Sequence, residues 1–171
     1  MINKEKFTQI CKSYFNFLTS DYDFHLISSK EDDWGYETLF KTNAVGVSLT
    51  FEYRDFYLFV KLCRLQKGEF PPKPGEIGPD TLLECFDLDD IVLLKSKESL
   101  IPPHKLDTKL DNALLESIIQ RQADNLKKFA KDILGGDFSS FLELDKIVKD
   151  RARIAAFQKW GKKAEEFGWT E

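Results

Sequence analysis

The sequence predicts an α+β fold: a four-stranded antiparallel β-meander with an N-terminal helix and a C-terminal helical hairpin packed on the sheet. Residues 45–53 alternate apolar and polar side chains, which is the period of a half-buried strand. Residues 110–133 repeat apolar side chains at helical spacing. The 171 residues are expected to form one domain, with the helix, meander and a short helix in 1–100 and the helical hairpin in 101–171.

The first half of the chain should begin with a helix, because Phe7, Cys11, Tyr14 and Leu18 share one helical face. Strands are predicted over residues 24–27, 36–41, 45–53 and 56–65, joined by short connections that favour neighbouring places in the sheet. The last of these strands looks apolar on both faces. It should therefore be covered on both, by the first helix on one side and by the long second-half helix on the other.

Residues 68–80 interrupt the periodic pattern with four prolines and three glycines. Neither a helix nor a strand ladder tolerates this composition, so the segment is predicted to be a long loop and the first place to look for function. A further short strand is possible near Thr81–Cys85. Next, a short helix should begin at the acidic residues 87–90 and end near Lys95.

The second half should hold two long helices. After Pro102-Pro103, the first begins near Asp107 or Thr108 and runs to Leu134, where Gly135 is predicted to supply a left-handed cap. The second is expected to open with a capping box formed by Ser140 and Glu143.

Composition narrows the classes of partner. The net charge of −4 gives no global cationic field to attract nucleic acid or anionic lipid. No apolar run approaches the ~18–20 residues of a membrane span, and the polar start does not suggest a signal peptide. Three widely spaced cysteines predict buried thiols in a reducing compartment. We therefore expect a cytoplasmic protein that does not associate with a membrane.

No catalytic, cofactor or metal constellation emerges from the motifs. The cluster Glu31-Asp32-Asp33 lacks the spacing and glycine of a calcium loop and is explained as a polar turn. His25 and His104 are the only histidines, and neither has a nucleophile beside it in the sequence. The cysteines are interpreted as small core side chains. No metal or cofactor is expected. The sequence does not decide whether the protein is an enzyme, and a non-enzymatic function is the preferred expectation.

Acidic and aromatic side chains are the strongest remaining signal. Buried aromatic anchors carry much of the binding energy in protein interfaces. The candidate partner-binding residues on this basis are Asp32, Asp33, Trp34, Tyr36 and Trp169. For Phe167 and Trp169, docking of the chain end onto the protein's own body is the competing interpretation.

The segment from Ala130 to Leu144, AKDILGGDFSSFLEL, together with Arg151, resembles the closing segment of a group of small uncharacterised bacterial proteins. Some proteins of that group are similar to immunity proteins, which neutralise partner toxins. The resemblance transfers no functional residue. It implies a bacterial, non-enzymatic protein that binds a protein partner.

Three functions therefore remain in view. The leading expectation is a protein-binding domain of immunity or adaptor type. The alternative is an enzyme or small-ligand-binding protein with a cleft between sheet and helices, near His25, Glu37, Glu52 or Arg54. The third is nucleic-acid binding through Lys146, Lys149 and Arg153, which share a face of the last helix; it is the least expected.

Overall fold

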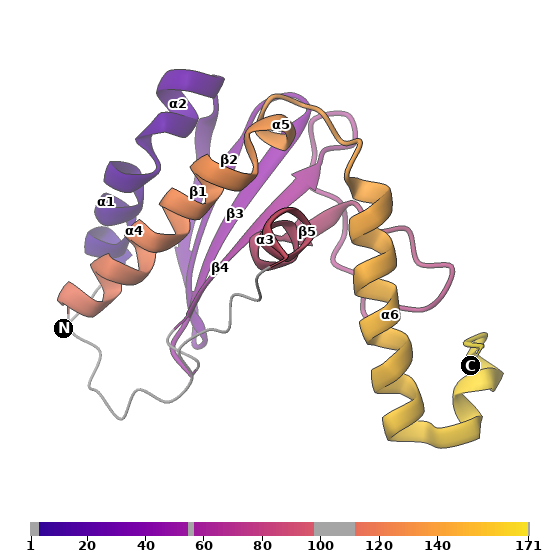
Figure 1. Ribbon diagram of the computed structural model, residues 1–171. Helices are drawn as coiled ribbons and strands as arrows, with labels where there is room; N and C mark the ends of the chain where they lie inside the picture. The colour runs from indigo at the N-terminus through magenta and orange to yellow at the C-terminus, as the bar shows by residue number, and fades with distance from the viewer. Residues whose placement is uncertain (1–3, 55–56, 98–111, 171) are drawn as a thin grey trace.

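The computed structural model describes residues 4–54, 57–97 and 112–170 (Figure 1). Its elements follow in chain order: α1 (Lys4–Tyr14), α2 (Asn16–Tyr22), β1 (His25–Glu31), β2 (Gly35–Lys41), β3 (Val45–Glu52), β4 (Tyr57–Arg64), β5 (Cys85–Asp87), α3 (Leu88–Ser96), α4 (Asn112–Phe129), α5 (Lys131–Leu134), α6 (Phe141–Trp160) and the 3₁₀ helix η1 (Gly161–Phe167). The predicted α+β class with an antiparallel sheet is confirmed. Within the described ranges, no helix has the length and apolar character needed to cross a bilayer.

The sheet has five strands, not the predicted four. Its order is β1-β2-β3-β4-β5, and every neighbouring pair is antiparallel. The additional strand, β5, pairs with β4 only over residues 61–63. A strand of three residues is too short to show a period of two, which is why the pattern near Thr81–Cys85 indicated a strand only weakly.

The core lies on one face of this sheet. Val47, Leu49 and Phe51 of β3 are fully buried there, beneath α1, α3 and α4. Phe7 of α1 stacks on Tyr36 of β2 with 4.9 Å between ring centroids. The predicted first helix is divided at Phe15 into α1 and α2. Both apolar stripes of α4 are used on this face, because α4 contacts α1, α3 and β4.

The prediction that helices cover both faces of the sheet is wrong. Figure 1 shows α1, α3 and α4 on the same side, and we call that side the inner face. The error came from β4, whose outer face was taken as continuously apolar. That face also carries Lys61, directly opposite Ser48 of β3. Over part of the outer face, the Pro/Gly-rich chain between β4 and β5 lies across the strands instead of a helix.

The predicted helical hairpin of 101–171 is not confirmed. In Figure 1, α3 lies between α4 and α6, and α6 contacts α3 and η1. Only Phe141 and Leu144 of α6 are buried, so its second half projects from the body. The predicted start of the long helix at 107–108 lies outside the described residues.

Two predicted helix caps are also wrong. Gly135 has a φ of −79°, and the left-handed conformation falls on Gly136, with a φ of 89°. Ser140 makes no capping hydrogen bond, and its hydroxyl oxygen is buried without a partner in the described part of the chain. Asp137 supplies a local bond instead, accepting from the backbone N–H of Ser139 at 2.9 Å.

Candidate functional site

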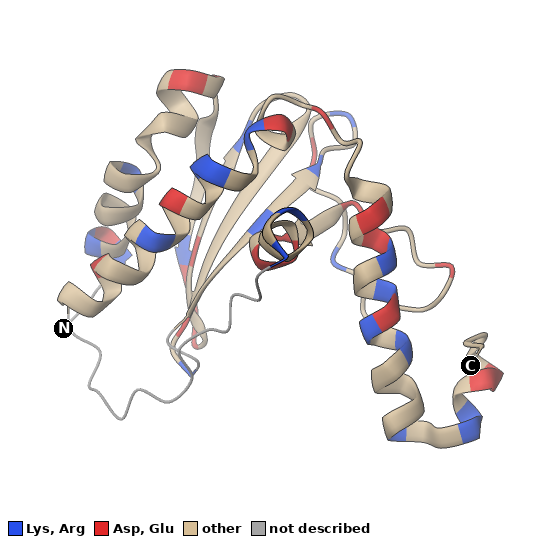
Figure 2. Cartoon of the chain, viewed as in Figure 1, with Lys and Arg blue, Asp and Glu red and all other residues tan. Residues whose placement is uncertain are grey.

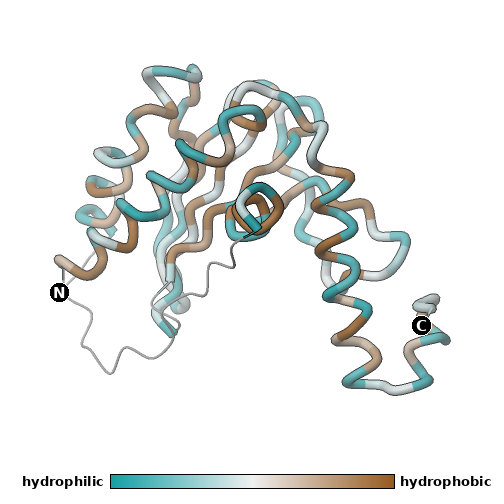
Figure 3. Tube along the Cα trace, viewed as in Figure 1, coloured by the Kyte–Doolittle hydropathy of each residue, from teal (hydrophilic) through white to brown (hydrophobic). Residues whose placement is uncertain are grey.

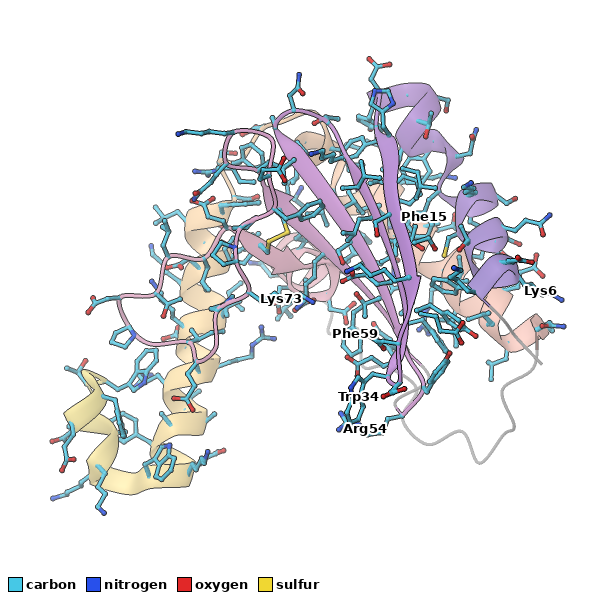
Figure 4. The ribbon with its side chains drawn as sticks, turned by 180° about the vertical axis from the view of Figure 1, so that it is seen from behind. Lys6, Phe15, Trp34, Arg54, Phe59 and Lys73 are labelled. Carbon is cyan, nitrogen blue, oxygen red and sulfur yellow. A yellow bond between two sulfur atoms is a disulfide. The ribbon has the colours of Figure 1, made fainter. Side chains whose placement is uncertain are left out.

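A cavity of about 630 Å³ lies on the outer face of the sheet. Its floor is formed by β2–β5, its cover by residues 70–84, which we call the covering segment, and one side by Val148 and Arg151 of α6. Figure 4 views the molecule from this side, with the strands in front and the inner-face helices behind. Most of the cavity lining is apolar, as in small-molecule sites generally.

One cross-strand row forms the centre of the floor. Leu39, Ser48, Lys61 and Asp87 lie directly opposite one another on β2, β3, β4 and β5. Side chains in such a row point to the same face and lie within reach of their neighbours. The row therefore places one ammonium and one carboxylate in an otherwise mostly apolar floor.

The covering segment is attached to the sheet in three ways. Phe70 lies over Gly46 of β3, where an added Cβ would come within 2.5 Å of the Phe70 ring. The Lys41 ammonium donates to the Gly68 carbonyl oxygen at 2.7 Å, just before the segment begins. A disulfide joins Cys63 of β4 to Cys85 of β5 at the segment's end. These attachments hold an irregular, Pro-rich chain across the floor.

The disulfide corrects the prediction of three buried thiols. Cys63 and Cys85 are direct partners in the β4–β5 register, and both line the cavity. Only Cys11 remains a free thiol; it is fully buried in the core, and burial raises its pKa. Because disulfides persist mainly in oxidising environments, cysteine usage no longer supports a reducing compartment.

Charged side chains around the cavity are mostly paired with one another. Glu37 lies between Lys30, at 3.2 Å, and Lys73 of the covering segment, at 3.6 Å; Figure 4 labels Lys73 at the outer face. Arg151 of α6 donates to Asp90 at 2.7 Å, and Asp90 is only 2% exposed. The Arg151–Asp90 pair connects α6 to the buried start of α3, whereas the Lys73–Glu37 pair is a surface contact of the cover and contributes little to holding it.

The pair on the floor is looser. The Lys61 ammonium is 3.9 Å from the nearest Asp87 carboxylate oxygen, beyond hydrogen-bond range. That oxygen of Asp87 is buried and has no hydrogen-bond partner among the described residues. Burial raises the pKa of Asp87; Lys61 opposes this, and the neighbouring Asp90 and Asp89 add to it. Within the floor, these two groups keep bonding capacity for a further molecule.

The three acidic residues at the start of α3 each make different contacts. Asp87 faces the cavity, Asp89 accepts from the Tyr57 hydroxyl at 2.7 Å, and Asp90 pairs with Arg151. Burial raises the pKa of Asp89, while the hydrogen bond from Tyr57 lowers it. Throughout the described ranges, no group of three or more His, Cys, Asp or Glu side chains is arranged to hold a metal ion.

The predicted partner-binding residues do not form one surface. Asp32 closes the β1–β2 turn by accepting from the backbone N–H groups of Trp34 and Gly35, at 2.8 and 3.0 Å. Asp33 is exposed, and Trp34 is 74% exposed. Tyr36, in contrast, is buried in the core at 2% exposure. A role for the turn in partner binding stays a prediction.

Trp169 follows η1 close to the C-terminus, and the C-terminus lies far from the β1–β2 turn in Figure 1. Its side chain is 8% exposed. The chain end lies against the covering segment, because an added Cβ at Gly168 would be 3.2 Å from Cγ of Pro79. Phe167 stays 59% exposed, with its ring 6.2 Å from that of Trp160.

The second half of α6 presents a further apolar surface. Ile154 and Phe157 line a shallow hollow on the helix. Beyond them, the ring of Trp160, the last residue of α6, lies 6.2 Å from that of Phe167 in η1. We call these four residues the α6 distal surface. Figure 3 shows the apolar stretch in this half of α6, and Figure 2 shows charged bands before and after it.

Sequence reasoning identified the covering segment and Glu37 but missed Lys61, Asp87 and Arg151. Lys61 interrupts an apolar strand, which was the available signal for a polar group on a covered face. The acidic character of Asp87 was attributed to its place at the start of a helix. Arg151 could not be identified because it reaches Asp90 of α3 only in the folded protein. Of the other predicted cleft residues, His25 is exposed at the start of β1, Glu52 is half-buried at the end of β3, and Arg54 is exposed. The second histidine, His104, lies outside the described residues.

Comparison with known proteins adds no relative: no protein-family model, curated protein or solved structure matches the chain.

Proposed function

We propose that this chain binds a small, largely apolar molecule in the cavity beneath the covering segment. The observation that carries the proposal is a cavity of about 630 Å³ with an attached cover and polar groups at its centre. This volume falls within the ~300–1,000 Å³ typical of small-molecule sites. The proposal moves the expected cleft from the helix–sheet junction, which is a packed core, to the opposite face.

An uncharged fluorescent probe tests the cavity without prejudging the ligand's charge. Nile red should bind in a one-to-one ratio and gain fluorescence. Ser48→Phe should abolish this binding, because the new ring would occupy the floor between Leu39 and Lys61. The matched control is Ser20→Phe on the exposed surface of α2, which should leave binding unchanged. Thermal melts of both variants check that they remain folded.

Two results would count against the cavity. The first is that Ser48→Phe, folded, binds the probe as well as the unmodified protein does. The second is that Trp160→Ser or Phe167→Ser removes the binding instead, which would locate the probe on the α6 distal surface.

Protein docking is the second candidate, favoured by the α6 distal surface and by the exposed Trp34. Ile154, Trp160 and Phe167 are each about half exposed or more, and clustered exposed apolar side chains often mark interaction sites. The resemblance of residues 130–144 to immunity-type bacterial proteins supports a protein partner of that class. The acidic turn 31–34 is a separate possible contact.

Affinity purification separates the two docking surfaces. A partner recovered by the unmodified chain should be lost from Ile154→Ser/Trp160→Ser if the α6 distal surface binds it, and lost from Trp34→Ser if the β1–β2 turn does. Leu142→Ser is the control, since Leu142 is exposed on α6 near the body. Recovery of the same partner by all of these variants would exclude both surfaces.

A further inference from the structure

The single ammonium on the cavity floor indicates the chemical class of the ligand. Lys61 is central in the cross-strand row, and its side chain is about half exposed where it lines the cavity. The other lining cations have carboxylate partners at 3.6 Å or closer: Lys30 and Lys73 share Glu37, and Arg151 holds Asp90. Lys61 is the lining cation at the centre of the floor, and at 3.9 Å from Asp87 its hydrogen-bond donors stay unused.

We propose that the cavity binds an amphipathic monocarboxylate, with the carboxylate on the Lys61 ammonium and the apolar body beneath the covering segment. This inference rests on the proposed function and specifies its ligand. Leu39 lies on the floor, with Phe70 and Ile77 in the cover, and all three line the space that an apolar body would occupy. A carboxylate at the floor would replace water around Lys61 with a charge-assisted hydrogen bond.

The surroundings of Lys61 favour one negative charge over two. Asp87 is 3.9 Å from the ammonium and would repel a dianion such as a phosphate monoester. Planar, two-pronged recognition of phosphate is typical of arginine. The lining arginine in the described structure, Arg151, is already bonded to the buried Asp90. A carboxylate therefore matches the floor better than a phosphate does.

An eight-carbon series tests the head group at constant chain length. Octanoate, octan-1-ol, octylamine and octyl phosphate are titrated separately into the full chain, followed by isothermal calorimetry and amide chemical shifts. Octanoate should bind about tenfold or more tighter than octan-1-ol, as expected for one hydrogen bond to a charged group. The shifted amides should belong to β2–β4 and the covering segment.

Substitutions test whether Lys61 is the source of the preference for octanoate. Lys61→Met keeps the length of the side chain and should remove the preference for octanoate over octan-1-ol, while octan-1-ol still binds. Lys61→Arg should retain a preference for octanoate. Asp87→Asn should tighten octanoate binding several-fold, because it removes the competing carboxylate. Lys12→Met, on the exposed surface of α1, is the control and should change none of these affinities.

The outcomes separate this inference from the function on which it rests. Equal binding of octanoate and octan-1-ol in the cavity would overturn the carboxylate assignment and leave the cavity as a ligand site. Preference for octylamine or octyl phosphate would overturn it in the same way. If none of the four binds and Nile red also fails to bind, the proposed function itself is excluded.

Discussion

At the residue scale, Gly35 of β2 has the least room for a side chain among the nine glycines of the chain. A Cβ added there would lie 1.7 Å from the Phe51 carbonyl oxygen, so the position has no room for a side chain. The neighbouring turn depends on the same place, because the Gly35 N–H donates to Asp32. Gly35 thus sets how tightly β2 and β3 can meet.

Gly35→Ala should lower the free energy of unfolding by about 3 kcal/mol, at the upper end of the cost of overpacking, because the obstacle is backbone and cannot rotate away. Urea denaturation followed by circular dichroism measures this. Gly75→Ala is the matched control: no atom lies within 4 Å of its added Cβ. Similar stability for the two variants would contradict the close packing at Gly35.

Asp87 makes stability depend on pH. Burial raises its pKa in the folded state above the unfolded value of about 3.9. A carboxyl shifted in this direction loses folding free energy as pH rises from the unfolded pKa through the folded one. Asp87→Asn should therefore stabilise the protein at pH 7, and this advantage should disappear below about pH 4. Denaturation curves at pH 3.5 and 7 test the sign, and a constant difference would refute it.

At the scale of elements, the cover of the cavity is not a helix or strand but a chain held at both ends. The Cys63–Cys85 disulfide joins residues 22 apart in sequence and fixes β5 beside β4. β5 in turn leads directly into α3, so the closure of the segment is linked to the placement of that helix.

Removing the disulfide should cost about 3 kcal/mol of stability, as loop-closure entropy predicts for a loop of this length. Cys63→Ala/Cys85→Ala should unfold at lower urea concentration than the oxidised chain and should be insensitive to reductant. The unmodified chain should lose comparable stability in dithiothreitol. Thiol titration of the denatured, unreduced chain should find one thiol, that of Cys11; three thiols would show that the bond is not formed.

At the scale of the whole molecule, the body is a sheet with helices on its inner face, and the second half of α6 extends away from it (Figure 1). α4 buries six of its residues, including Leu115, Ile119 and Leu126, whereas α6 buries Phe141 and Leu144 at its start. Stability should therefore be unevenly distributed between these two helices.

Amide hydrogen exchange should show this difference. Residues 150–158 of α6 should exchange through local opening at a lower free energy than residues 118–126 of α4, which should approach the global value. Mass spectrometry or NMR resolves the two segments. Equal protection would mean that the second half of α6 is covered in solution, by a partner or by a second copy.

The sequence predicted the class, the four longer strands and the existence of the two long second-half helices from their periodic patterns. It did not predict that the helix expected to reach Leu134 is divided at Ala130 into α4 and α5. It could not predict which face each helix covers, because that depends on contacts between distant elements. The same limit applies to the site. Residues 68–80 could be identified from composition alone, but Cys63 and Cys85 become partners only when β5 pairs with β4. Lys61 can be recognised in the sequence as a charged residue within an apolar strand, but the residues that surround it in the fold cannot be predicted from the sequence.

Gln122 of α4 has a consequence for how copies of this chain meet. Beyond Lys61, towards the start of β4, β5 no longer pairs with that strand, and open strand edges invite intermolecular β-pairing. Gln122 donates from its amide nitrogen to the Leu58 carbonyl oxygen at 3.1 Å and to the Tyr57 hydroxyl at 2.8 Å. A side chain thus occupies a bonding position that a strand from another copy of the chain would use.

Gln122→Leu should promote aggregation on refolding, measured by light scattering, in addition to any loss of stability.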